Sequence, residues 1–135
     1  MDDQERLAAL LEDAHRLPNE QRIPLLETAL ELADASGDRR QGVEIRIRLA
    51  EALQFVGSID SGPLIQGLID RLDAREITDP EQVYSVLWMN KWLINNLVDD
   101  AGVDLARLRE AVAAMRRRYR RHKQDPQPVL RAAYG

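Results

Sequence analysis

Apolar residues between positions 25 and 57 recur at intervals of three and four, in two runs separated by a short polar break. An α-helix turns once every 3.6 residues, so apolar positions with this spacing lie on one side of the helix. The stretch therefore predicts two amphipathic helices that pack through their apolar sides. The first run is Leu26, Ala29, Leu30, Leu32 and Ala33, and the second is Ile45, Leu49, Ala52, Leu53 and Val56.

The break between the two runs carries an end signal and a start signal. Gly37 follows Ser36 and can adopt the left-handed conformation that commonly ends a helix. Asp38 and Gln41 are spaced as in a capping box, in which two side chains bind backbone N–H groups at a helix start. We expect this hairpin to be the centre of stability, with Leu49 and Leu53 fully buried.

The same periodicity predicts further helices, with starts near residues 2, 20, 39, 62, 80 and 104. Asn19 is the expected cap of the second helix, although Pro24 leaves open a start at residues 23–24. Either Thr78 or Asp79 can cap the fifth helix, and Asp104 can cap the sixth. The helices fall into three antiparallel pairs, which predicts an all-α fold.

Each pair takes about 40 residues, which suggests a short α-solenoid of stacked helix pairs, with an irregular helical bundle as the structural alternative. A single helical-repeat domain is expected over residues 1–124, followed by a tail at 125–135 that could begin a further helix. The fifth helix is apolar on nearly all sides, so we expect it to be wedged between several neighbours. On one side it carries Tyr84, Trp88, Lys91, Trp92 and Asn95, a stripe that is expected to lie mostly in the core.

The central hairpin resembles a tetratricopeptide repeat (TPR) of the kind found in multi-repeat bacterial proteins. The resemblance lies in an ALELA…GD stretch and in Leu49, Ala50, Leu53 and Gly57, although Arg46 stands where that repeat has a tryptophan. In TPR-like proteins the first helix of each pair lines a concave groove that holds a peptide. The resemblance therefore implies partner-binding residues at Glu44, Ile47, Arg48, Glu51 and Phe55, and at Tyr84, Trp88, Lys91, Trp92 and Asn95.

The amino-acid composition indicates the cellular compartment that we expect for the protein. The chain has no cysteine, its amino end is acidic, and no apolar run approaches the roughly 20 residues that span a bilayer. We therefore expect a cytoplasmic protein without a membrane segment.

Charge is distributed unevenly along the chain. Residues 1–104 carry 10 basic and 21 acidic side chains, whereas residues 105–135 carry 9 basic and 2 acidic ones. A basic patch, Arg116, Arg117, Arg120, Arg121 and Lys123, surrounds Tyr119 near the end of the sixth helix. It is either a solvated helix end favoured by the helix dipole or a surface for an acidic partner or nucleic acid. We expect its arginines to be exposed and dispensable for folding.

Catalytic and metal-binding signals are missing from the sequence. His15 and His122 lie far apart and have no ligand partners at suitable spacing, and no phosphate-binding loop or nucleophile motif occurs. We therefore expect no enzyme activity, no metal and no cofactor. The expected function is a non-catalytic protein- or peptide-binding or scaffold module, with a nucleic-acid-associated regulatory domain as the alternative. Self-association is a further expectation, through the apolar tail or between the basic end of one copy and the acidic body of another.

Overall fold

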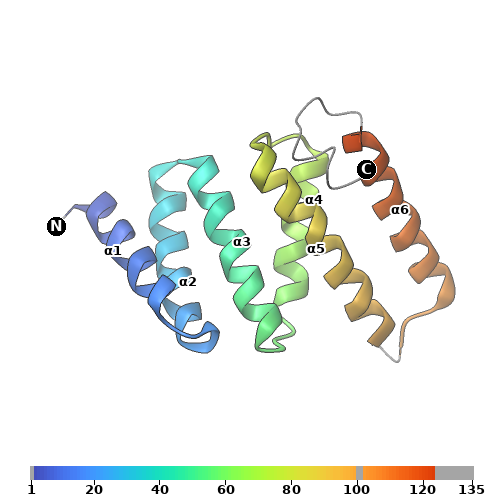
Figure 1. The fold of residues 1–135 in the computed structure, drawn as a ribbon, viewed down its shortest axis with the longest axis horizontal. Helices are drawn as coiled ribbons and strands as arrows, with labels where there is room; N and C mark the ends of the chain where they lie inside the picture. Colours follow the sequence, from blue (N-terminus) through green and yellow to red (C-terminus); the bar gives the residue numbers. More distant parts are fainter. Residues whose placement is uncertain (1, 100–101, 124–135) are drawn as a thin grey trace. The chain divides into compact units, whose positions relative to one another are not determined.

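The computed structural model of the chain describes residues 2–99 and 102–123. These residues form six α-helices and no β-strand, so the predicted all-α fold is confirmed (Figure 1). Helices that follow each other along the chain pack as adjacent pairs. The helices are α1 (Asp3–Arg16), α2 (Asn19–Ser36), α3 (Arg39–Phe55), α4 (Ser61–Asp73), α5 (Pro80–Asp99) and α6 (Leu105–Lys123).

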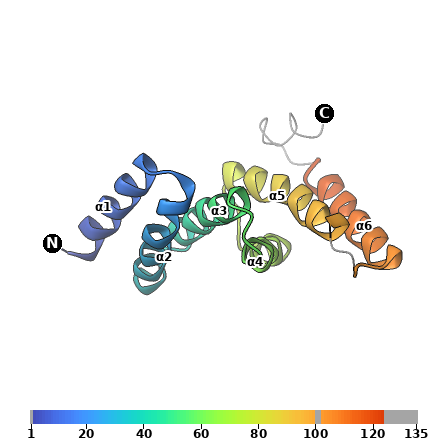
Figure 2. The same ribbon diagram turned by 90° about the horizontal axis from the view of Figure 1, so that it is seen from below.

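The chain divides into two compact units, Met1–Leu64 (unit 1) and Ile65–Gly135 (unit 2). The prediction of one domain over residues 1–124 stays a prediction, and the tail at 125–135 lies outside the described residues. In unit 1, α2 lies between α1 and α3 (Figure 1). In unit 2, α6 packs against α5, and both views draw α4 next to α5 (Figures 1 and 2). No helix within the described residues is both long and apolar enough to cross a membrane.

The core of unit 1 is built from the apolar stripes of three helices. Small residues of α2, Ala29 and Ala33, are fully buried and allow the neighbouring helices to approach closely. Leu49 of α3 is buried as predicted, whereas Leu53 is only partly buried at the edge. The buried members of this core are Leu7, Ala14, Leu26, Ala29, Ala33, Ile45, Leu49 and Ala52.

The start of α2 differs from the prediction. The helix begins at Asn19, its cap is Pro18 without a side-chain hydrogen bond, and Pro24 lies inside the helix. The turn is held instead by Arg22, whose guanidinium donates to the carbonyl oxygens of Ala14 at 2.7 Å and Leu17 at 2.8 Å. These carbonyls lie in the last turn of α1 and just after it, where backbone partners are few, and among the described residues the Ala14 carbonyl accepts otherwise only from the backbone N–H of Leu17. One side chain of α2 therefore bonds to the end of α1 and fixes the turn.

The turn from α2 to α3 confirms both sequence signals, but only one half of the capping box forms. Gly37 has a φ of +77°, and the Asp38 carboxylate accepts from the backbone N–H of Gln41 at 3.1 Å. The backbone N–H of Asp38 bonds to the Ser36 hydroxyl at 3.3 Å, and Gln41 Oε1 is buried without a hydrogen bond. Ser36 therefore takes the place that the Gln41 side chain has in a complete box.

The apolar side chains of unit 2 are less evenly buried than those of unit 1. The α4 residues Ile65, Leu68, Ile69 and Leu72 are almost inaccessible to solvent, whereas the apolar side of α6 is only half-buried. The α5 start is capped by Asp79, whose carboxylate accepts from the N–H groups of Glu81 and Gln82, which settles the choice between Thr78 and Asp79. The predicted cap of α6 is confirmed, since the Asp104 carboxylate accepts from the Arg107 N–H at 2.7 Å.

Candidate functional site

The outer face of α5 carries an aromatic and cationic cluster. Trp88 is 49% exposed, and the Lys91 ammonium lies 3.6 Å from the centre of its ring. The Tyr84 ring meets Trp88 edge-on, with ring centres 6.3 Å apart and planes at 68°. A cation over an indole face and an edge-on aromatic contact both stabilise a defined ring orientation. The Trp88 side chain is therefore held in place at the surface.

This cluster corrects two predictions about α5. The stripe was expected to lie mostly in the core, but Trp88, Lys91 and Asn95 are exposed, and Tyr84 and Trp92 are half-buried. The helix was also expected to be buried on several sides, yet its buried residues lie on the opposite side from Trp88. The buried set is Gln82, Val83, Val86, Leu87, Met89 and Asn90. The hydropathy of α5 did not separate its buried side from its exposed side, because the exposed side carries aromatic residues in addition to Lys91.

We call Tyr84, Trp88, Lys91, Trp92 and Asn95 the α5 face. These residues are spaced by four, three, one and three along the helix, so they share one side of it. Tyrosine and tryptophan offer large rigid contact areas together with polar groups, which is the chemistry enriched at the centres of protein interfaces. The α5 face is thus suited to contact another molecule through Trp88.

The second predicted set lies on α3 in unit 1. Glu44 and Arg48 form an ion pair at 3.5 Å, and Ile47 is buried rather than available to a partner. Phe55 at the end of α3 is 70% exposed. Burial raises the pKa of Glu51, and the negative charge of Glu44 adds to this shift, while Arg48 and Arg22 oppose it. The α3 set therefore combines the charged residues Glu44, Arg48 and Glu51 with the exposed aromatic ring of Phe55.

The basic patch on α6 separates into two groups. Arg116, Arg117 and Arg120 are exposed, as predicted. Arg121 is exposed too, as predicted, but it also donates to the Leu72 carbonyl oxygen at 3.4 Å and lies 3.7 Å from the Asp73 carboxylate. The side chain of Lys123 lies outside the described structure.

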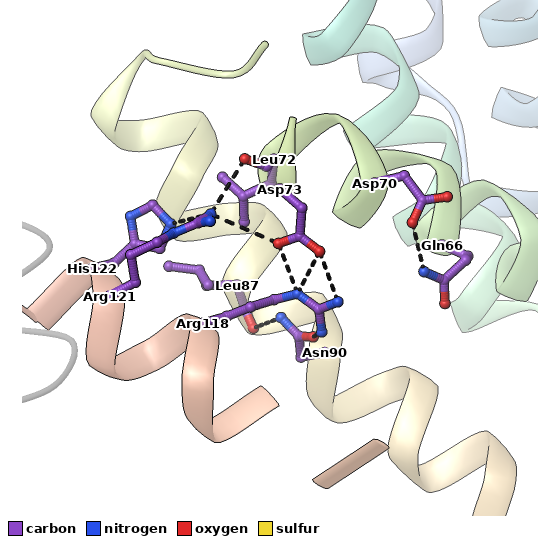
Figure 3. Close-up of polar contacts among 9 residues, drawn as sticks. All are labelled: Gln66, Asp70, Leu72, Asp73, Leu87, Asn90, Arg118, Arg121 and His122. Atoms are coloured by element: carbon purple, nitrogen blue, oxygen red, sulfur yellow. Dashed lines mark hydrogen bonds and ion pairs between the residues drawn. The ribbon is translucent and has the colours of Figure 1, made fainter. Parts of the chain in front are cut away.

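Sequence reasoning counted Arg118 only as one of the basic residues around Tyr119 and missed its contacts, which join three helices of unit 2 (Figure 3). Its guanidinium donates from Nε to Asp73 Oδ1 at 3.0 Å and from Nη2 to Asp73 Oδ2 at 2.8 Å. A third contact runs from Nη1 to Asn90 Oδ1 at 3.4 Å, and Asn90 donates to the Leu87 carbonyl at 3.1 Å. These bonds, with the nearby Arg charges, hold the pKa of Asp73 below its usual value. Arg118 is therefore a structural clasp between α4, α5 and α6.

Tyr119 completes the attachment of α6. Its hydroxyl donates to the Leu87 carbonyl oxygen at 3.1 Å, and burial raises its pKa. The Arg118 clasp and the Tyr119 bond leave the opposite side of α6 to solvent, with Arg116, Arg117 and Arg120. No sequence signal distinguishes Arg118 from its neighbours, because Asp73 lies 45 positions earlier in the chain.

Over residues 2–99 and 102–123, no group of three or more histidine or carboxylate side chains is placed to hold a metal ion. Comparison with protein families, with curated proteins and with solved structures finds no match to this chain. The resemblance to tetratricopeptide repeats therefore depends on the residues of the central hairpin alone.

Proposed function

We propose that this chain is a non-catalytic helical-repeat module of tetratricopeptide type that binds a protein or peptide through the α5 face. The observation that carries the proposal is Trp88, a large aromatic side chain that is half-exposed yet held in orientation by Lys91 and Tyr84. A side chain that is ordered before binding loses little conformational entropy when a partner covers it. Such residues dominate the binding energy of many interfaces.

The chemistry of the face indicates how a partner would bind. An apolar side chain of the partner can pack on the exposed part of the Trp88 ring. The Lys91 ammonium can donate to a partner carbonyl or carboxylate while it remains over the ring, and the Asn95 amide can bond to a peptide backbone. The α5 face thus offers an apolar contact next to polar contacts, as peptide-binding surfaces do.

The test compares two variants that each remove one exposed apolar side chain. Trp88→Ala alters the α5 face, whereas Ile59→Ala, at a residue that is 91% exposed in unit 1, serves as the matched control. Immobilised wild-type protein and both variants are incubated with lysate of the source organism, and retained proteins are identified by mass spectrometry. Circular dichroism verifies that all three proteins are equally helical.

We expect a partner that the wild-type protein and the Ile59→Ala protein retain equally. Trp88→Ala should weaken its binding at least about tenfold, as expected for the loss of a central aromatic contact. A partner that binds all three proteins equally would mean that the α5 face is not the binding surface.

A second candidate function, nucleic-acid binding, is favoured by the exposure of Arg116, Arg117 and Arg120. Within residues 2–99 and 102–123, none of these three side chains forms an ion pair. Phosphate contacts by several arginines make affinity fall steeply with salt, by orders of magnitude between about 50 and 200 mM. Weak binding to a DNA duplex, with an affinity that hardly changes with salt, would rule out nucleic-acid binding.

A further inference from the structure

Three acidic side chains form a stripe on the outer side of α2. Glu20, Glu27 and Glu31 are spaced by seven and four residues, so they point in nearly the same direction from the helix. All three are exposed, and no cation of the described residues is paired with any of them. Glu27 and Glu31 are like charges one turn apart, an arrangement that destabilises a helix when no opposite charge is near.

A basic stripe with the same spacing lies on α6. Arg109, Arg116 and Arg120 are also separated by seven and four residues, are exposed, and are not paired with any carboxylate in the described part of the chain. They lie on the side of α6 that points away from the Arg118 clasp. Arg116 and Arg120 again place like charges one turn apart. A contact between the acidic stripe and the basic stripe would therefore relieve the like-charge repulsion within each helix.

The two stripes match in register as well as in charge. If α2 and α6 are set side by side in the same direction, Glu20 meets Arg109, Glu27 meets Arg116 and Glu31 meets Arg120. The stripes each extend about 16 Å, since 11 residues rise about 1.5 Å each. The position between the first two charges is occupied by a residue without a long side chain in both helices, Pro24 in α2 and Ala113 in α6. Neither obstructs a close approach.

We propose that the acidic stripe of α2 is a binding surface for the basic stripe of α6 in a second copy of this chain. The contact joins two different surfaces, so a pair of copies retains one unused acidic stripe on one copy and one unused basic stripe on the other. Association therefore continues into chains unless a ring closes. This inference is independent of the α5 face, because Trp88 belongs to neither stripe. Its charges are exposed, so the association is expected to be weak and sensitive to salt.

Charge-reversal variants test the pairing. The acid-reversed variant carries Glu27→Lys with Glu31→Lys, and the base-reversed variant carries Arg116→Glu with Arg120→Glu. A control, Glu5→Lys with Asp13→Lys, makes the same change in net charge as the acid-reversed variant, on exposed residues of α1. Sedimentation equilibrium measures the average mass of each protein over a range of concentrations at about 20 mM salt, and circular dichroism verifies folding.

We expect the wild-type protein and the α1 control to increase in average mass with concentration, and to revert to monomer at about 0.5 M salt, where charges are screened within a few ångströms. Each reversed variant alone should remain monomeric. An equimolar mixture of the two should associate again, because each stripe then meets an opposite charge on the other protein.

Three results would overturn the proposal. The first is a wild-type protein that is monomeric at low salt and high concentration. The second is association that either reversal leaves unchanged or that the mixture does not restore. The third is a monomer whose arginine stripe instead binds a DNA duplex with a steep salt dependence, which would assign the stripe to phosphate recognition.

Discussion

Burial of single side chains determines which substitutions unit 1 can tolerate. Leu49 is 6% exposed and belongs to the core of three helices, so Leu49→Ala leaves a cavity and should cost about 2 to 5 kcal/mol of unfolding free energy. Leu53 is only partly buried, so Leu53→Ala should cost less, although the sequence pattern predicted equal burial. Urea unfolding followed by circular dichroism measures both. A Leu49→Ala cost below about 1 kcal/mol, similar to the exposed control Ile59→Ala, would contradict this packing.

Glu51 is a residue at which burial works against stability. Its pKa is raised in the folded state, so the folded protein binds a proton more readily than the unfolded chain does. The folded state is therefore penalised above the folded pKa, and the penalty disappears as the pH falls below the unfolded value. Glu51→Gln should slightly stabilise the protein at pH 7 and should lose this advantage near pH 4. Equal unfolding midpoints of both proteins at pH 7 would contradict the effect.

The attachment of α6 shows how one side chain can fix an element. Asp73 at the end of α4 accepts two bonds from Arg118, and its pKa is lowered in the folded state, so the stability it contributes is present above the unfolded pKa of about 3.9. That contribution is lost as the pH falls through the folded pKa. Asp73→Asn should therefore destabilise unit 2 at pH 7 by about 1 kcal/mol, a modest value because the pair is partly exposed.

The measurement for Asp73 uses the two tryptophans, which both lie in α5 and report on unit 2. Urea unfolding followed by their fluorescence should show a gap between wild type and Asp73→Asn at pH 7 that closes toward pH 2. The matched control is Asp70→Asn on the same helix, because Asp70 bonds only to Gln66 within α4 in the bonds shown (Figure 3). A gap that is as large for Asp70→Asn, or that persists at pH 2, would rule out the clasp as its cause.

Helix positions were predictable from the sequence because their signals are local. Gly37, Asp38, Asp79 and Asp104 each act within three or four residues, and the structure places helix ends beside all of them. The start of α2 was not predictable in the same way. Arg22 satisfies carbonyls up to eight residues earlier, on another helix, and no short-range pattern indicates that contact.

Helix faces were harder to predict than helix positions. The apolar character of α5 indicated burial on several sides, but aromatic side chains such as Trp88 are amphipathic and can remain at the surface when Lys91 and Tyr84 cover part of the ring. On α6, the density of arginines indicated a uniform basic surface. The structure assigns Arg118 and Arg121 to the contact with α4, because Asp73 is close in space although distant in sequence.

Considered as a whole, the molecule combines two compact units of different charge. Residues 1–64 carry 7 basic and 13 acidic side chains, whereas residues 65–135 carry 12 basic and 10 acidic ones. The asymmetry was evident from the sequence, but the matched stripes on α2 and α6 became apparent only once burial and ion pairs were known. A partner of the α5 face and a second copy of the chain would contact different residues.

Trp88 is proposed as the centre of a binding surface, and its fluorescence reports directly on whether a partner covers it. In a Trp92→Phe background Trp88 is the sole tryptophan, so acrylamide quenching measures its exposure before and after a captured partner is added. We expect quenching to fall several-fold and the emission to shift to shorter wavelength as the partner covers the half-exposed ring. A partner that binds at saturation while Trp88 remains as accessible to acrylamide as in the free protein would contradict a binding surface centred on Trp88.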